Sequence, residues 1–412
     1  MLRRFRDRLG SHTQALKTLQ GSLERKDQEI TNLRSRLENK DERLEKLRGR
    51  LKAREQTLKV AKHRLQTKEQ ALAELQEQMA SNRNSPNATS GDAPVFFLVG
   101  QAKSGTSWLM RMLNAHPEIL CSGEGRFFGR DYKREDVKRM WPRVQPSSLY
   151  RAILDAEYLN AWIERSVWTR DDDKDEHLDN LTHLAVEYFL TEQLSKAGKS
   201  IVGDKTPFID DETVGEIKAI YPEARVIHLI RDGRDAAVSA MHHLWNYPIG
   251  LGGLEDLEPE EYLKRDAYRE DPQKFLQSEE GLFTEKRIRN LAGVWSTNVS
   301  RAMEEGPKLL GENYTEVRYE ELLERPDEEL KNLLEFLGAD AREETIERCV
   351  GLTSFERWTK GRERGQEDST VLLRKGISGD WRNSFTERDR EIFKEVAGDT
   401  LVRLGYEEDR EW

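Results

Sequence analysis

A lysine within a loop rich in glycine and hydroxyl groups is the most informative chemical feature of this sequence. Residues 95–108 read VFFLVGQAKSGTSW. The apolar half predicts a buried strand, and the second half predicts a turn into a helix from about Thr106. Backbone N–H groups and the dipole at such a helix start favour an anion. The stretch therefore predicts a phosphate-binding loop.

This loop differs from that of P-loop ATPases, in which lysine directly follows the second glycine of GxxxxGK[ST]. Gly100 and Gly105 have the required spacing, but Thr106 stands at the lysine position and the lysine is Lys103. The sequence thus predicts phosphate binding without the usual handling of Mg-ATP. A nucleotide or small-molecule kinase stays open as an alternative, with Asp204 as its magnesium carboxylate.

A second strand-turn-helix segment, VIHLIRDGRDAAVS, covers residues 226–239. It places Arg231 at the end of a strand and Ser239 two turns into the following helix. The bidentate guanidinium and the hydroxyl are suited to a second phosphate. The alternative is an ion pair of Arg231 with Asp232 or Asp235 that only holds the turn together.

A third segment, LRKGISGDWRNSFT, covers residues 373–386. Arg374, Lys375 and Gly376 form a short cationic loop in which glycine exposes the backbone. Thr386 then predicts the N-cap of a C-terminal helix. A cationic loop alone is usually a solvated turn, but three such segments in this order indicate a shared anionic ligand.

In order and spacing, KSGTSW, RDGRDAAVS and RKGISGDWRNSFT resemble the nucleotide-binding regions of sulfotransferases that use 3′-phosphoadenosine 5′-phosphosulfate (PAPS). The resemblance covers roughly residues 94–408. It implies PAPS as co-substrate, no metal ion, and transfer of a sulfuryl group to a hydroxyl or amine. It assigns the 5′-phosphosulfate to Lys103, Ser104, Gly105, Thr106 and Ser107, and the 3′-phosphate to Arg231, Ser239, Arg374, Lys375 and Gly376. Trp108 occupies the family's aromatic position, near adenine or in the core.

The resemblance also suggests the catalytic residues. Lys103 would stabilise the leaving oxygen. The segment EGRFF is similar to a glutamate-containing segment of glycan sulfotransferases, so Glu124 is the expected general base. Lys205 in GDKTP resembles their supporting lysine. His242 and His243 are alternative bases. The acceptor is then a carbohydrate hydroxyl, with a lipid-linked or small-molecule hydroxyl as the next choice.

The first 80 residues predict a different structure. Leucine, isoleucine or methionine recurs every seven residues from Leu2 to Met79, while the layer from Phe5 to Leu75 alternates apolar with largely basic residues. A sustained heptad predicts a coiled coil, and hence a homo-oligomer or a heterotypic helical partner. Residues 1–80 carry 20 Lys/Arg and 12 Asp/Glu. Their positive charge allows weak contact with a polyanion or a membrane surface.

The composition and the positions of proline and glycine give the remaining expectations. Residues 81–93 are small, polar and broken by proline and glycine, which predicts a linker before a sulfotransferase-like domain at 94–412. Strands alternating with helices predict a P-loop-like, three-layer α/β domain with a mainly parallel sheet.

The sequence contains no apolar run of transmembrane length, and its two cysteines fit a reducing, cytoplasmic setting. Residues 250–283 are interpreted as an insertion or acceptor lid. An inactive domain on a coiled-coil scaffold is the non-enzymatic alternative.

Overall fold

The computed structural model describes residues 26, 93–128, 148–169, 173–206, 211–246, 257, 259–272, 275, 281–368 and 374–412. Lys26 is exposed and helical; the rest of the predicted coiled coil and the linker through residue 92 lie outside the described residues. The chain divides into two compact units, Met1–Ala88 and Thr89–Trp412. All that follows concerns the second unit.

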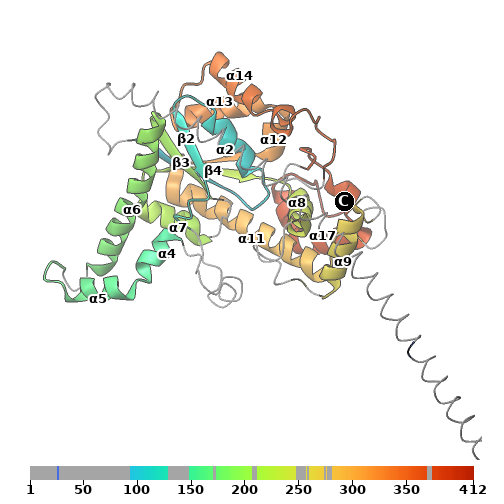
Figure 1. Cartoon of the computed structure of the whole chain (residues 1–412), viewed down its shortest axis with the longest axis horizontal. Coiled ribbons are helices and arrows are strands. Elements are labelled where there is room, and N and C mark those ends of the chain that lie inside the picture. The colour runs from blue at the N-terminus through green and yellow to red at the C-terminus, as the bar shows by residue number, and fades with distance from the viewer. Residues whose placement is uncertain are drawn as a thin grey trace, which may run out of the picture. The chain divides into compact units, whose positions relative to one another are not determined.

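The second unit is built around a five-stranded sheet in the order β2-β3-β1-β4-β5 (Figure 1). The strands are β1 (Val95–Val99), β2 (Ile119–Gly123), β3 (Ile201–Thr206), β4 (Arg225–Ile230) and β5 (Tyr314–Arg318). Every pair of neighbouring strands is parallel. All strands therefore end at the same edge, where α/β folds place their ligands. The predicted parallel α/β fold is confirmed.

Helices connect these strands and cover the sheet. Their bounds are α2 (Thr106–Asn114), α4 (Leu149–Leu154), α5 (Glu157–Arg165), α6 (Lys174–Ala197), α7 (Asp211–Ile220), α8 (Gly233–Asn246), α9 (Pro259–Glu270), α11 (Glu285–Leu310), α12 (Tyr319–Glu324), α13 (Pro326–Leu337), α14 (Glu343–Leu352), α15 (Phe355–Thr359), α16 (Trp381–Ser384) and α17 (Glu387–Arg403). A short 3₁₀ turn, Gly311–Asn313, precedes β5. Thr386 caps α17 through a capping box with Asp389, as its sequence predicts.

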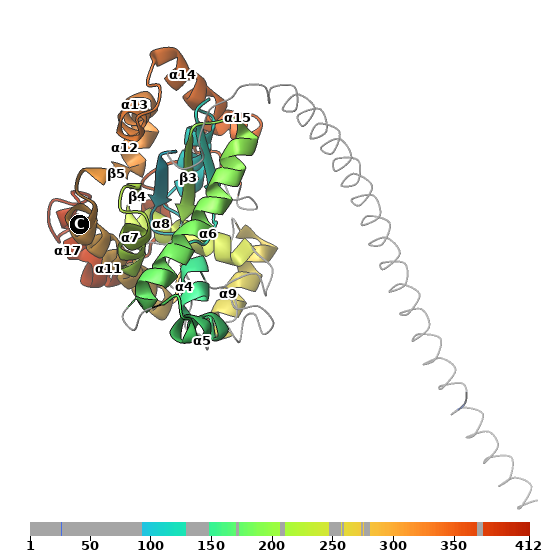
Figure 2. The same ribbon diagram turned by 90° about the vertical axis from the view of Figure 1, so that its left-hand side faces the viewer.

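The alternation of side chains along β1 explains the three layers. Phe96 and Leu98 pack into a core with residues of α2, α13 and α14. Phe97 and Val99 point to the other face and pack with α6, α7 and the end of α11. Figures 1 and 2 show these two groups of helices on opposite faces of the sheet. The predicted three-layer arrangement is confirmed.

The structure differs from the sequence predictions at several element boundaries. A strand was expected only over Ser200–Val202, but β3 continues to Thr206, so Lys205 is a strand residue. The extension arises because β3 is paired on both sides, by β1 and β2, which outweighs its polar composition. Strands β2 and β5 were not predicted, since both are short and carry polar residues. Within residues 250–283 the described part includes helix α9; its role as a lid stays a prediction.

Three further observations concern the described residues alone. No helix among them is long and apolar enough to cross a membrane. Cys121 and Cys349 are both free and buried. The described His, Cys, Asp and Glu side chains form no group that could hold a metal ion.

Candidate active site

The predicted phosphate loop joins the end of β1 to the start of α2. Gly105 precedes the helix with φ of 98°, and its carbonyl accepts hydrogen bonds from the backbone N–H groups of Trp108 and Leu109 at 2.8 and 3.2 Å. A Cβ at Gly105 would lie 2.5 Å from the ring of Tyr319. Both the conformation and the space require glycine here. The free N–H groups of the first turn of α2, around Thr106 and Ser107, are therefore presented at the strand ends.

Ser104 and Trp108 differ in what they offer a ligand. Ser104 is 1% exposed, and its Oγ has no hydrogen-bond partner among the described residues. Trp108 donates through Nε1 to the carbonyl of Thr353 at 3.1 Å and packs edge-on against Tyr319. Trp108 thus belongs to the core, whereas the Ser104 hydroxyl is a buried polar group that lacks a partner. A buried group of this kind is costly unless something satisfies it.

Lys103, Lys205 and Glu124 form a charged cluster at the ends of β1, β2 and β3. Lys205 Nζ lies 2.8 Å from a carboxylate oxygen of Glu124 and 3.4 Å from Ser107 Oγ. Burial, followed by the neighbouring cations Arg231 and Lys205, lowers the pKa of Lys103 to about 8, although the charge of Glu124 acts in the opposite direction. The cluster has two cations for one carboxylate, so it is suited to an additional anion.

The loop after β2 orients Glu124. Glu124 has φ of 62°, and its N–H donates to the carbonyl of Lys205 at 2.8 Å. Next to it, the Gly125 N–H donates to Asp204 Oδ1 at 2.9 Å. Burial raises the pKa of Asp204 to about 6. The Glu124 side chain is left 55% exposed, so its carboxylate is accessible from solvent.

Arg231 connects all three predicted nucleotide-binding segments. It donates from one guanidinium nitrogen to the carbonyl of Lys103 at 2.9 Å and from the other to the carbonyl of Ile377 at 3.4 Å. Its guanidinium lies over the ring of Tyr319, 4.3 Å from the centroid, and its Nε is buried without a partner among the described residues. Of the two ion pairs in the alternative, the one with Asp235 is present at 4.0 Å, whereas Asp232 pairs with Arg234 at 2.8 Å.

Asp235 fixes the third segment to the start of α8. One carboxylate oxygen accepts from the N–H of Gly379 at 2.6 Å, and the other accepts from the N–H of Trp381 at 2.9 Å. The Asp235 side chain is 1% exposed, and burial raises its pKa. This buried double contact sets where the 374–381 loop lies relative to Arg231.

The cations of the third segment are paired with carboxylates. Arg374 pairs with Asp380 and, at 2.8 Å, with Glu367. Lys375 lies 2.8 Å from Asp380 and 3.1 Å from Glu367. Gly376 has φ of 64° and packs against Phe355 so closely that a Cβ would be 2.4 Å from the ring. An anion at Arg374 and Lys375 would therefore have to compete with Glu367 and Asp380.

The remaining predicted residues lie on α8. Ser239 is partly buried in its second turn. His242 is buried with Nδ1 2.7 Å from the hydroxyl of Tyr268, and burial lowers its pKa to about 3. Burial and then the charge of Lys103 lower the pKa of His243 to about 4. Both histidines are thus weak bases, and His243 is the one close enough to sense Lys103 and Glu124.

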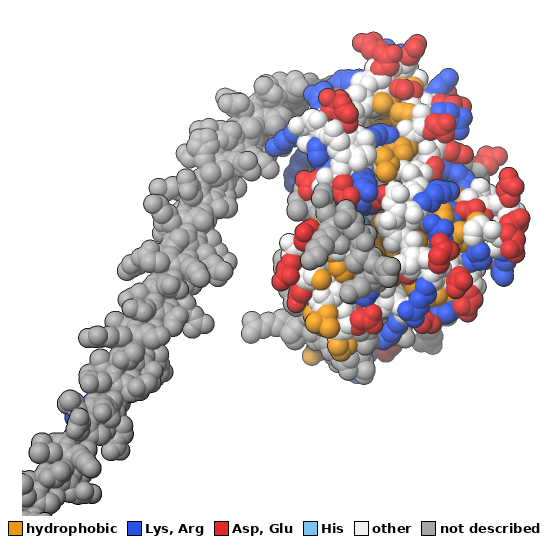
Figure 3. All heavy atoms as spheres, turned by 90° about the vertical axis from the view of Figure 1, so that its right-hand side faces the viewer, with side chains coloured by type: hydrophobic (Ala, Val, Ile, Leu, Met, Phe, Trp, Pro, Cys, Tyr) orange, Lys and Arg blue, Asp and Glu red, His pale blue; other side chains and the backbone are white. Residues whose placement is uncertain are grey.

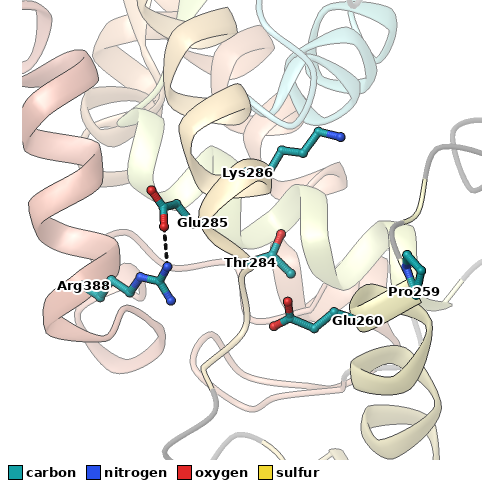
Figure 4. Close-up of a pocket in the computed structure, with 6 residues that line it drawn as sticks. All are labelled: Pro259, Glu260, Thr284, Glu285, Lys286 and Arg388. Carbon is teal, nitrogen blue, oxygen red and sulfur yellow. Dashed lines mark hydrogen bonds and ion pairs between the residues drawn. The ribbon is translucent and has the colours of Figure 1, made fainter.

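A separate cavity of about 510 Å³ lies between the starts of α9, α11 and α17 (Figure 4). It is lined by Pro259, Glu260, Thr284, Glu285, Lys286 and Arg388. Glu285 and Arg388 pair with each other across its edge. None of the residues predicted to bind nucleotide or to act in catalysis lines it, so the charged cluster at the strand ends remains the candidate site.

Sequence reasoning missed the residues that position the site. Asp235 appeared only as a partner for Arg231, while Tyr319 and Glu367 were not considered. Trp295, which donates to the carbonyl of Arg231 at 3.0 Å, was also missed. Only the Asp235 position lies within a predicted segment; the others come from helices and loops whose sequence shows no phosphate-binding pattern.

Comparisons with known proteins show which family the chain resembles. The model of the sulfotransferase family matches residues 94–343. Protein-tyrosine sulfotransferase 1 of Danio rerio is 26% identical over 259 residues, which cover 62% of this chain and 56% of that protein. Sulfotransferase 1B1 of Mus musculus is 31% identical over 198 residues, covering 43% of this chain and 56% of that protein. The chain thus spans little more than half the length of these relatives.

Solved structures with a similar fold are more distant in sequence. A mouse sulfotransferase, SULT7A1, complexed with PAP, is 18% identical with a TM-score of 0.41, covering 79% of this chain and 90% of that one. The sulfotransferase domain of the Synechococcus PCC 7002 olefin synthase is 16% identical with a TM-score of 0.40, covering 76% of this chain and 97% of that one.

Proposed function

Because this chain belongs to the sulfotransferase family, we propose that it transfers a sulfuryl group from PAPS to an acceptor hydroxyl. The observation that carries the proposal is the junction at Arg231, whose guanidinium binds the carbonyls of Lys103 and Ile377. This junction holds the phosphate loop, the α8 segment and the cationic loop at one edge of the sheet. Two separated cationic sites there suit a nucleotide with phosphates at both its 5′ and 3′ positions.

The side chains fit such a nucleotide. The buried Ser104 Oγ and Arg231 Nε have no partner within the described protein, and phosphate oxygens would supply acceptors. The loop from Lys103 to Ser107 is proposed to bind the 5′-phosphosulfate through the start of α2. Arg231 and Ser239 are proposed to bind the 3′-phosphate, with Arg374, Lys375 and Gly376 closing over it.

In the proposed reaction, Lys103 and Glu124 have separate roles. The acceptor oxygen forms a bond to sulfur while the bond from sulfur to the bridging phosphate oxygen breaks, which releases adenosine 3′,5′-bisphosphate (PAP). Lys103 stabilises the charge on the leaving oxygen. Glu124 accepts the acceptor proton, and Lys205, 2.8 Å from its carboxylate, holds it in position.

A carbohydrate hydroxyl is the first proposed acceptor, because the EGRFF segment with Glu124 is similar to that of glycan sulfotransferases. A tyrosine hydroxyl in a protein is the second candidate. It is supported by the relative named protein-tyrosine sulfotransferase 1, which aligns with 62% of this chain. Incubation with PAPS and either a polysaccharide or a tyrosine-containing acidic peptide distinguishes the two by which product carries sulfate.

Nucleotide binding is the first test. Calorimetry without metal should show tight binding of PAP and much weaker binding of AMP and ATP, since only PAP carries the 3′-phosphate. Preference for ATP with Mg²⁺ would replace the proposal with a kinase. No binding of either nucleotide would favour an inactive domain on a scaffold.

The general base is tested by Glu124→Gln. We expect turnover to fall by about 10²–10⁴-fold, the usual contribution of a general base, while the Kd for PAP changes less than about twofold. Glu305→Gln, an exposed carboxylate on α11, is the matched control and should leave both unchanged. If Glu124→Gln instead loses PAP binding, Glu124 is a structural residue and His243→Asn becomes the next variant to measure.

The predicted coiled coil is proposed to assemble copies of the chain. Removal of residues 1–90 should then lower the oligomer mass measured by light scattering and leave transfer to a small acceptor intact. A folded truncation that loses transfer would show that this segment contributes to the site or recruits the acceptor.

A further inference from the structure

Helices α5 and α6, together with the turn that follows α5, carry a group of exposed apolar side chains that the proposed reaction does not use. They lie at one side of the domain, where α5 packs against α6 (Figure 2). The group comprises Tyr158, Trp162, Val167, Trp168, Leu181, Leu184, Tyr188 and Phe189, which are between 37% and 93% exposed. We call this group the α5–α6 surface.

Helix α6 is apolar on two opposite faces. Its inner face buries Leu178, Val186 and Leu190 against the domain. Its outer face exposes Leu181, Leu184 and Tyr188, spaced three and four residues apart as in a helix–helix seam. An exposed apolar seam opposite a buried one is suited to a second packing contact.

The size of the surface matches a protein interface. Its five aromatic side chains are each at least half exposed. At about 150–250 Å² per aromatic side chain they present on the order of 600 Å². A standard interface buries about 800 Å² per partner, and an exposed apolar patch of several hundred Å² marks an interaction site. On the opposite side of the domain, positive, negative and apolar side chains are intermixed (Figure 3).

We propose that the α5–α6 surface binds the same surface of a second copy of this chain, with the two α6 helices antiparallel. The seam is centred on Leu184, close to the middle of α6 (Lys174–Ala197). In an antiparallel pair the apolar middle of one α6 faces the apolar middle of the other. The polar ends of the two helices then face each other as well, as a two-fold contact requires.

The helix dipoles favour this arrangement. The charged side chains of α6 are mixed at both ends, since Asp175 and Glu176 follow Lys174 and Lys196 pairs with Glu192 at 2.7 Å. The orientation therefore follows from the dipoles, which oppose each other favourably in an antiparallel pair, whereas their like ends would meet in a parallel pair. An anionic membrane is a poorer occupant, because acidic residues flank the seam.

The surface also reaches the candidate site. Phe127, three residues after Glu124, stacks on Phe189 of α6 with ring centroids 6.5 Å apart. A second copy bound at α6 would lie against the loop that carries the proposed base. The dimer contact is independent of the proposed reaction, so the two fail or succeed separately.

Cysteine cross-linking of the full chain tests the contact, since both native cysteines are buried. Leu184→Cys lies near the two-fold axis and should form a disulfide-linked dimer rapidly under mild oxidation. Leu263→Cys, on α9 and 73% exposed, is the control. It measures how fast exposed thiols cross-link when two chains are held together by some other contact. If Leu184→Cys cross-links no faster than Leu263→Cys, the proposal is wrong.

Two further variants test orientation and chemistry. Ser195→Cys places thiols about 30 Å apart in the antiparallel dimer, from about 1.5 Å of rise per residue, and should not cross-link. Cross-linking there as fast as at position 184 would overturn the antiparallel arrangement.

Adding Tyr188→Asp to Leu184→Cys should lower the yield of cross-linked dimer at least tenfold, whereas adding Val294→Asp, on α11, should not. Equal yields with both would refute an apolar contact.

Discussion

Replacing Lys103 with methionine should make the domain more stable while it removes catalysis. Lys103 is largely buried and lies near two other cations, Arg231 and Lys205. Mainly because of burial, its pKa of about 8 lies well below the ordinary value of 10.5. Since a pKa lowered by one corresponds to about 1.4 kcal/mol, the charged form costs about 3 kcal/mol in the folded state. Methionine keeps most of the volume and removes that cost.

The sign of the pH dependence follows from the same lowered pKa. Below pH 8 Lys103 is charged in both the folded and unfolded states, and the cost is fully present. Between about pH 8 and pH 10.5 the unfolded chain binds more protons, so wild-type stability rises relative to the variant. The gap between the two proteins should therefore be largest at neutral pH and should close by about pH 10.5.

Thermal unfolding at several pH values measures this gap. For a domain of this size we expect Lys103→Met to raise Tm by several degrees at pH 7, at about 2–4 °C per kcal/mol. Lys331→Met, on the exposed side of α13, is the control and should change stability by less than about 0.5 kcal/mol. Sulfuryl transfer by Lys103→Met should fall by at least about 10²-fold. A variant less stable than wild type at pH 7, or a gap independent of pH, would refute the reasoning.

Three other substitutions test the cationic loop by calorimetry with PAP. Glu367→Gln removes a carboxylate that competes with phosphate, so PAP should bind severalfold more tightly; the exposed Glu363→Gln should have no effect. Asp235→Ala frees the N–H groups of Gly379 and Trp381, so PAP affinity should fall at least tenfold while the fold persists by circular dichroism. Gly376→Ala, forced against Phe355, should weaken PAP binding similarly, and unchanged affinity would show that the loop is dispensable.

The local chemistry of the site could be predicted because it lies in short contiguous segments. The phosphate loop, the end of β4 and the cap of α17 each follow from neighbouring residues, whose propensities and hydrogen bonds act over a few positions. Thr106, directly after Gly105, likewise excluded the usual ATPase lysine. The parallel sheet followed from the alternation of strands and helices.

Only the tertiary structure decided how these segments meet. Lys205 became a strand residue because β1 and β2 both pair with β3. Glu124 reached Lys205, and Arg231 reached both Lys103 and Ile377, through contacts between residues about 80 to 150 positions apart. Lowered pKa values at Lys103, His242 and His243 arise mainly from burial, which no local pattern reveals. Residue types set what chemistry is available, whereas packing sets distances and solvent access, on which that chemistry depends.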